Sequence, residues 1–252
     1  MPSPAAALTR LASRLQHHGA LSSDERELIL SLPFRAKTLP ANTRLFREDE
    51  PVDECSVLLD GFACRYKLMP NGARQILNIL VPGEVIGLEP MLLGRADHAV
   101  DVLDRAEIAL LRTSSLDELL AAHPRIARAF WLMTIRETAI QREWTANIGR
   151  RDARSRLAHL LCELAVRLEE AGLGRRGRFD LPLTQTQLAD CTGLTPVHIN
   201  RTLQLLRAEG LIRTDARIVD VPDWERLREA ADFEPAYLRA GAAPKAGPAV
   251  VA

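Results

Sequence analysis

Hydrophobic and polar positions alternate with a helical period between residues 183 and 212, in two short runs separated by a glycine turn. Thr184 is placed to cap a first helix, with Gln187 three positions later to return the hydrogen bond. Thr195 is placed as the N-cap of a second helix, and Pro196 stands at its first position, where a missing N–H costs nothing. The pattern predicts a helix-turn-helix.

The second of these helices, which Gly210 ends, has two distinct faces. Its apolar face carries Ile199, Thr202, Leu203 and Leu206. The opposite face, which is free to meet DNA, carries Val197, Arg201, Gln204 and Ala208. Residues 211–213 and 217–221 read as two short strands around a turn at 214–216, where a winged helix carries its wing. The alternative interpretation is a helical hairpin inside an ordinary core.

Residues 34–112 have the sequence pattern of short strands separated by turns. Their turn glycines recur every 11 residues, at Gly61, Gly72, Gly83 and Gly94. Asn71-Gly72 lies between two apolar stretches and is a strong hairpin signal in its own right. Strands at this spacing predict a β-sandwich or roll.

A long helix is predicted from Pro124 to Gly149. Residues spaced by three and four form the seam expected of a two-stranded coiled coil: Ile126, Phe130, Met133, Glu137, Ile140, Trp144 and Ile148. Glu137 is the misfit in this apolar series. The seam predicts a dimer interface, whereas Trp131 and Ile135 on a second face are expected to pack on the β-roll. The alternative is an ordinary helix lying on the β-domain.

Length and composition allow two domains with proper cores, since the chain has 252 residues and is 47% hydrophobic. The predicted divisions are 1–122 for N-terminal helices and a β-roll, 123–150 for the dimerisation helix, 151–235 for the winged helix-turn-helix and 236–252 for a flexible tail. No apolar run approaches the ~18 residues that span a membrane, and the N-terminus lacks a secretory signature, so the expected location is the cytoplasm.

Cysteine and charge patterns agree with this division. The four cysteines form no close pair, so neither a zinc site nor a disulfide framework is predicted, and buried thiols are expected; they are Cys55, Cys64, Cys162 and Cys191. The formal net charge is zero, but residues 150–217 contain 12 arginines against 8 acidic residues. The basic excess therefore lies in the region that is predicted to bind DNA.

The order of parts resembles the Crp/Fnr superfamily of bacterial transcription regulators over residues 32–233. The resemblance is most specific in residues 154–161 (RSRLAHLL) and 183–212. It implies an α+β fold with an N-terminal β-roll (a double-stranded β-helix), a long dimerisation helix and a C-terminal winged helix-turn-helix.

The resemblance also implies which residues contact DNA. Arg201 matches the family's base-reading arginine, and Val197 stands where members usually carry glutamate. Gln185 falls at a phosphate-contact position. The predicted DNA-binding surface comprises Gln185, Thr195, Pro196, Val197, His198, Asn200, Arg201 and Gln204.

The sensor half departs from the family pattern. Gly83 and Glu84 resemble the start of the phosphate-binding cassette, in which the glutamate would hold a cyclic nucleotide's ribose, but Asp97 replaces the cassette's later arginine. Arg95 has the same strand phase and is a candidate to compensate, and His98 lies beside Asp97. Because a carboxylate repels the cyclic phosphate, we expect no response to cyclic AMP.

Other cofactors are weighed from residue types. An iron–sulfur cluster is not expected because residues 1–54 contain no cysteine. Haem stays open, since six histidines are available at positions 17, 18, 98, 123, 159 and 198, although a lone histidine is more often structural. No metal site is predicted.

The sequence thus predicts a dimeric, sequence-specific DNA-binding transcription regulator that recognises a palindromic operator, with RNA polymerase as an expected partner and no membrane partner. An enzyme is not expected, because no supported Ser-His-Asp arrangement, Walker loop, GxGxxG or HExxH is present. The alternative function is a cyclic-nucleotide-binding sensor or protein-interaction module without specific DNA binding, which a DNA shift assay discriminates.

Overall fold

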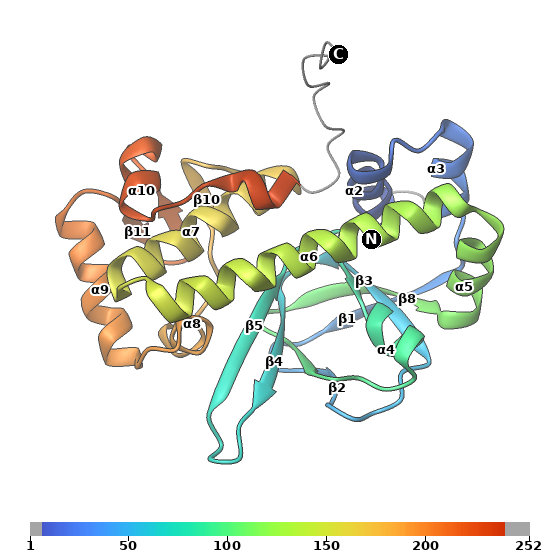
Figure 1. The fold of residues 1–252 in the computed structure, drawn as a ribbon, viewed down its shortest axis with the longest axis horizontal. Coiled ribbons are helices and arrows are strands. Elements are labelled where there is room, and N and C mark those ends of the chain that lie inside the picture. The colour runs from blue at the N-terminus through green and yellow to red at the C-terminus, as the bar shows by residue number, and fades with distance from the viewer. Residues whose placement is uncertain (1–6, 240–252) are drawn as a thin grey trace, which may run out of the picture.

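The computed structural model describes residues 7–239 and is organised around one long helix, α6 (Pro124–Arg150). A β-roll and the N-terminal helices lie along one end of α6, and the helix-turn-helix region lies at the other end (Figure 1). The N-terminal helices are α2 (Thr9–Gly19) and α3 (Ser23–Leu30). None of the helices in this part of the chain is long and apolar enough to cross a membrane.

The β-roll consists of two four-stranded antiparallel sheets, with strand orders β1-β8-β3-β6 and β2-β7-β4-β5. Its elements in chain order are β1 (Phe34–Leu39), β2 (Arg44–Phe46), β3 (Glu54–Asp60), β4 (Ala63–Leu68), β5 (Arg74–Leu80), β6 (Val85–Ile86), α4 (Leu88–Leu93), β7 (Ala99–Val102) and β8 (Ala106–Arg112). Helix α5 (Thr113–Ala122) leads from the roll into α6. The predicted β-roll is confirmed.

The four regularly spaced glycines are all at turns with a left-handed backbone, with φ between 82° and 92°. Gly72 closes the β4–β5 hairpin, as predicted, through a Gly72 N–H to Met69 O hydrogen bond of 2.9 Å. At Gly61 a side chain is also excluded by space, because a Cβ would lie 2.3 Å from the carbonyl oxygen of Arg105. The 11-residue period therefore marks real turns of the roll.

Helix α6 begins at Pro124, as predicted, and ends one residue later than expected, at Arg150. Most of its predicted dimer seam is covered by the chain itself: Ile126 and Phe130 pack with α2 and α5, and Ile140 and Trp144 pack into the core shared with the helix-turn-helix region. These four side chains are at most 5% exposed, so their assignment to a dimer interface is wrong.

The prediction for the second face of α6 is also wrong. Trp131 and Ile135 do not pack on the β-roll; they are 69% and 53% exposed. Met133 and Ile148, the remaining apolar seam residues, are half-buried. A helix with apolar residues on two faces can present either to its own core, and the spacing does not distinguish them. Glu137, the misfit in the series, pairs with the buried guanidinium of Arg65.

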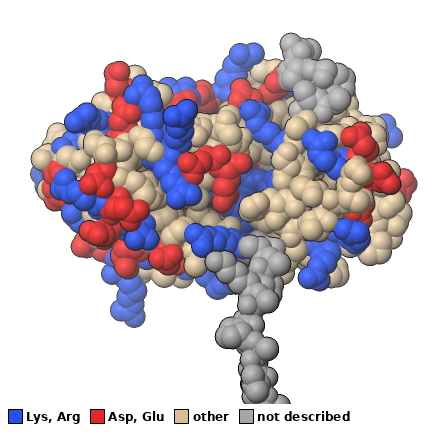
Figure 2. Space-filling view, turned by 90° about the horizontal axis from the view of Figure 1, so that it is seen from above, with Lys and Arg blue, Asp and Glu red and all other residues tan. Residues whose placement is uncertain are grey.

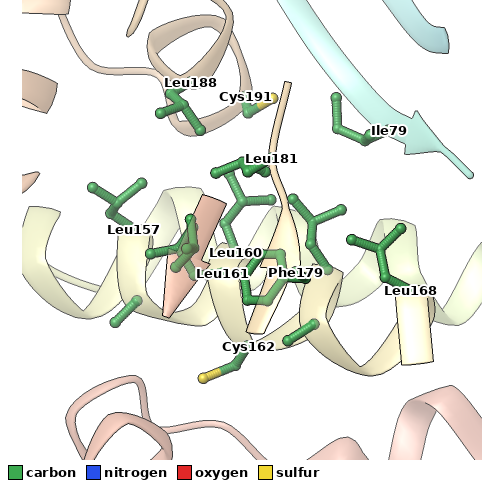
Figure 3. Packing of buried hydrophobic residues seen from close by; sticks show 14 of the residues in the cluster. Ile79, Leu157, Leu160, Leu161, Cys162, Leu168, Phe179, Leu181, Leu188 and Cys191 are labelled. Carbon is green, nitrogen blue, oxygen red and sulfur yellow. The ribbon is translucent and has the colours of Figure 1, made fainter. Parts of the chain in front are cut away.

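The C-terminal region combines four α-helices with a four-stranded sheet of order β11-β12-β10-β9. Its elements are α7 (Ala153–Glu170), β9 (Gly174–Arg175), β10 (Arg178–Asp180), α8 (Gln185–Thr192), α9 (Pro196–Ala208), β11 (Arg213–Asp215), β12 (Ile218–Asp220), α10 (Trp224–Ala230) and the 3-10 helix η1 (Pro235–Arg239). The apolar side of α7 faces this region's core, and Ile79 from β5 enters the same core (Figure 3). The C-terminal region and the β-roll thus share one hydrophobic cluster.

The end of the described chain is ordered further than expected. A flexible tail was predicted from residue 236, but η1 packs on the core, with Leu238 buried and the Tyr237 hydroxyl donating to Glu163 at 2.8 Å. That part of the prediction is wrong, because an aromatic hydroxyl and a leucine find buried partners on α7. Residues 240–252 of the predicted tail lie outside the described residues.

A fully buried guanidinium helps to join the C-terminal region to the β-roll. Arg167 of α7 has a fully buried side chain and donates to Asn78 Oδ1 (3.0 Å), to the Ile79 carbonyl (2.5 Å), and to the carboxylates of Glu84 (3.1 Å) and Glu163 (3.0 Å). Glu163 also accepts two bonds of 3.0 Å from the indole N–H of Trp144. All these charges are compensated inside the protein, which is the condition for burying them.

We expect Arg167→Met to lower the free energy of unfolding by about 3–5 kcal/mol, because it leaves two buried carboxylates without their shared cation. Urea denaturation at pH 7 measures the change. Arg35→Met is the matched control: Arg35 pairs with Glu54 on the surface with a side chain that is 73% exposed, so its loss should cost at most about 1 kcal/mol. Equal effects of the two substitutions would contradict this account of the junction.

Candidate DNA-binding surface and sensor pocket

The helix-turn-helix has the local structure that its sequence predicts. The Thr184 hydroxyl accepts a hydrogen bond from the Gln187 N–H (3.2 Å), and the Gln187 side chain accepts one from the Thr184 N–H (2.8 Å), which completes the capping box. The Thr195 hydroxyl caps α9 by accepting from the His198 N–H at 3.2 Å, and Pro196 is the first helical residue. These bonds satisfy N–H groups that a helix start otherwise leaves unpaired.

Helix α9 buries one face and presents the other to solvent, as predicted. Ile199, Thr202, Leu203 and Leu206 are buried against α7 and α8. The predicted DNA-contacting residues that are exposed are Gln185, Thr195, Pro196, Val197, His198, Arg201 and Gln204. Asn200 is half-buried. Within residues 7–239, no hydrogen bond or ion pair engages the guanidinium of Arg201.

A groove runs beside this exposed face, between α9 and the start of α7. Asp152, Ala153 and Arg154 line one side, and Val197, His198, Arg201 and Leu205 are among the residues on the other. Arg154 donates to the Glu209 carboxylate at 2.6 to 3.1 Å, which holds the start of α7 against the end of α9. The residue pattern of α9 alone did not indicate this groove, because its second wall comes from a segment about 40 residues earlier in the sequence.

The predicted wing is present as the hairpin β11–β12, which turns at Ala216 with φ 49°. Arg213 on its first strand is exposed. Arg217 is engaged within the subunit: its Nη2 lies 2.6 Å from a carboxylate oxygen of Asp104 in the β-roll and 3.1 Å from one of Asp180. The wing therefore stands beside α9, and its turn is tied to the β-roll.

Charges of both signs are interspersed on the face seen in Figure 2, and no broad area of one sign is visible there. This agrees with the formal net charge of zero. Attraction to a polyanion must therefore come from local groups on α9 and the wing rather than from a field of the whole molecule.

In the sensor half, Glu84 lies in the interior, where the chain's own cations occupy its carboxylate. Arg14 of α2 contacts it at 3.0 Å and Arg167 at 3.1 Å. Burial alone raises the pKa of Glu84, but the two guanidiniums outweigh it and hold this pKa at about 2. The glutamate that would hold a ribose in the family pattern is thus already bound.

Three other residues predicted for the effector pocket, Arg95, Asp97 and His98, make their ion pairs away from Glu84. Arg95 pairs with Asp49 at 3.4 Å on the surface, and Asp97 is bonded to Nδ1 of the neighbouring His98 at 2.6 Å. Burial raises the pKa of Asp97, but the hydrogen bond and the charge of His98, with smaller contributions from a backbone hydrogen bond and Lys67, together lower it. Gly83 lies against α2, since a Cβ there would meet Arg10 at 3.3 Å.

The cavity between the β-roll and α6 is nearly filled. It is lined by side chains that include Arg14, Arg65, Asn78, Glu84, Arg136 and Glu137, and it encloses about 20 Å³. That volume suits a single water molecule. Arg65, which the sequence analysis did not single out, is buried and paired with Glu89 (3.1 Å) and Glu137. Its cation is therefore neutralised by the chain itself.

All four cysteines are free and buried, as predicted. Burial raises the pKa of the Cys55 and Cys64 thiols to about 12. Such thiols are protonated at neutral pH and are poor nucleophiles.

The fold and the site together define a winged helix-turn-helix protein with a cyclic-nucleotide-binding-like β-roll. Residues 36–123 match the model of the cyclic nucleotide-binding domain, and residues 155–230 match that of the Crp-like helix-turn-helix domain. The chain belongs to the Crp/Fnr family of transcription regulators.

Named relatives support the regulatory class. The chain is 31% identical to the transcriptional activator protein FnrL of Cereibacter sphaeroides over 72% of this chain and 74% of that protein. It is 28% identical to the nitrogen fixation regulation protein FixK of Bradyrhizobium diazoefficiens over 67% and 70% of the two chains. Among solved structures, FixK2 from Bradyrhizobium japonicum superimposes with a TM-score of 0.72, at 27% identity, over 79% of this chain and 98% of that one.

We predict that cyclic AMP leaves the melting temperature unchanged, because Glu84 is bound by arginines and Asp97 carries the wrong charge. A ligand at 100 times its Kd stabilises a protein by about 2.7 kcal/mol, which differential scanning fluorimetry detects easily. Adenosine 5′-monophosphate at the same millimolar concentration is the control for non-specific effects. A melting shift with cyclic AMP that the control does not reproduce would refute the prediction.

Proposed function

We propose that this regulator is a homodimer that reads a palindromic operator by inserting α9 into the major groove. The observation that carries the proposal is Arg201, whose guanidinium has no partner in the described chain and lies on the exposed face of the Thr195-capped helix α9, beside a wing. In helix-turn-helix proteins the second helix reads base edges through its N-terminal part. Selection of binding sites from random DNA with the purified protein tests the proposal, which predicts enrichment of an inverted repeat.

The exposed face of α6 supports a dimer, in place of the seam predicted from the sequence. Trp131, Ile135, Thr138, Arg142 and Thr145 are exposed and follow one another at spacings of three and four. The helix has 27 residues and is therefore about 40 Å long. An exposed tryptophan and isoleucine one turn apart are costly in water, and a second copy of the same stripe would cover them.

Arg201 is proposed as the principal base reader. It lies one turn into α9, and its guanidinium is free to pair with O6 and N7 of a guanine. The competing role is a phosphate contact, which arginines make often. Val197 is 64% exposed and stands where the family pattern has glutamate. This difference supports a half-site whose sequence, outside the G·C pair read by Arg201, differs from the usual one of the family.

The remaining parts of the proposal concern activity and partners. The protein acts by binding, not by catalysis, and operates in the cytoplasm on promoters served by RNA polymerase. The relatives FnrL and FixK are named as an activator and a regulator, and their names support this class of action. Reconstituted transcription from a selected operator tests it.

We expect the double substitution Trp131→Glu/Ile135→Glu to produce monomers that keep the wild-type melting temperature, because both side chains are already exposed in the subunit. Light scattering after gel filtration at micromolar concentration measures the mass. Ala121→Glu/Ala122→Glu at the exposed end of α5 adds the same charge and should stay dimeric. A monomeric wild-type protein, or a dimeric Trp131/Ile135 variant, would contradict the proposed interface.

We expect Arg201→Ala to lose about 1–3 kcal/mol on the selected operator and to relax preference at one G·C pair in each half-site. Gel shifts on specific and scrambled DNA at several salt concentrations give the measurement. Arg213→Ala on the wing is the matched control and should weaken both DNAs alike, with a smaller salt slope. If Arg201→Ala keeps the wild-type ratio of affinities, Arg201 is not the base reader and Asn200 becomes the candidate.

A further inference from the structure

A second cavity, distinct from the nearly filled pocket, lies between α2 and the end of α7. It encloses about 400 Å³, which falls within the range of small-molecule sites. Arg10, Ser13, Arg14 and His17 of α2 line one wall, and Arg136 of α6 and Glu170 of α7 line the others. The cavity thus opens where the N-terminal helix, the long helix and the C-terminal region meet.

The charged groups of this cavity are mostly cationic. Three guanidiniums line it, against the single carboxylate of Glu170. The side chains of Arg136 and Arg14 are only 4% and 9% exposed. Arg136 bonds Glu170 through Nη2, while its buried Nε has no hydrogen-bond partner within the described part of the chain. A buried donor without a partner is costly and marks a place for an acceptor.

The nearby carboxylates do not cancel this excess. Glu84 is shared between Arg14 and Arg167, and Glu163 is shared between Arg167, Trp144 and Tyr237. Burial lowers the pKa of Arg14; Glu84 opposes this, and the charges of Arg136 and Arg167 lower it further. The guanidiniums crowd one another, so an added anion would relieve their repulsion.

We propose that this cavity binds a small organic anion through a phosphate or carboxylate group held by Arg136 and Arg14. The planar guanidinium fork suits both groups, because each presents two or more oxygens to parallel N–H donors. Arg10, Ser13 and His17 are exposed at the mouth of the cavity and contact the rest of the ligand.

The site has a direct structural route to the C-terminal region. The Arg136–Glu170 ion pair ties α6 to the end of α7. An anion on Arg136 competes with the Glu170 carboxylate, whose side chain is 33% exposed and is able to turn to water. Any consequence for DNA affinity rests on the proposed function, whereas binding itself does not.

The test is ligand binding to the full-length protein without DNA. Inorganic phosphate, 3-phosphoglycerate and succinate are titrated at constant ionic strength by calorimetry and by melting temperature, with glycerol as the uncharged control. Ser13→Glu places a negative charge at the mouth without touching the buried pairs, and Ser13→Gln is its neutral match. Gln16→Glu adds the same charge to an exposed position of α2 outside the cavity.

We expect saturable binding of inorganic phosphate to the wild type, about tenfold weaker in Ser13→Glu because of charge repulsion, and unchanged in Ser13→Gln and Gln16→Glu. Arg136→Gln should abolish phosphate binding. If Arg136→Gln does not fold, the Ser13 variants test the proposal in its place.

Tighter binding of 3-phosphoglycerate or of succinate identifies the preferred group. No saturable binding of any of the three anions, or equal affinities in Ser13→Glu and Gln16→Glu, would overturn the proposal. Because no DNA is present, a failure here is separate from a failure of operator binding.

Discussion

The arrangement of the whole subunit depends on one buried cation, the guanidinium of Arg167. It joins α7 of the DNA-binding region to β5 and to the cassette glutamate Glu84 of the β-roll. Desolvating such a group is costly, so it can be buried only where all its partners are assembled at once. Its burial therefore selects the one docking of the two regions that brings Glu84, Glu163 and Asn78 together.

Two further ion pairs also hold the DNA-binding region against the β-roll. Arg74 of the β4–β5 hairpin binds Asp190 of α8 at 2.7 Å, and Arg217 of the wing binds Asp104 of the β-roll. Helix α8 and the wing are thus positioned against the subunit's own sensor half, while the outer face of α9 stays open. A change in the sensor half has a continuous path of contacts to the DNA-binding surface, and α6 spans the same distance as a rigid element.

The parts predicted correctly from sequence are those whose determinants are local. The caps at Thr184 and Thr195 act within one helical turn, and the hairpin at Gly72 depends on its own backbone. The seam of α6 was assigned to the wrong face because both faces carry apolar residues, and only the packing of distant segments decides between them. The sequence also could not predict that arginines occupy the carboxylate of Glu84, because these partners, Arg14 and Arg167, lie 70 and 83 residues away in the chain.

The central claim, that two copies of α9 enter successive major grooves, is tested most directly by hydroxyl-radical footprinting of the protein on its selected operator. The account predicts two protected segments related by two-fold symmetry, with centres about 10 base pairs apart or a multiple of that spacing. A single protected segment, or protection that does not depend on sequence, would contradict it.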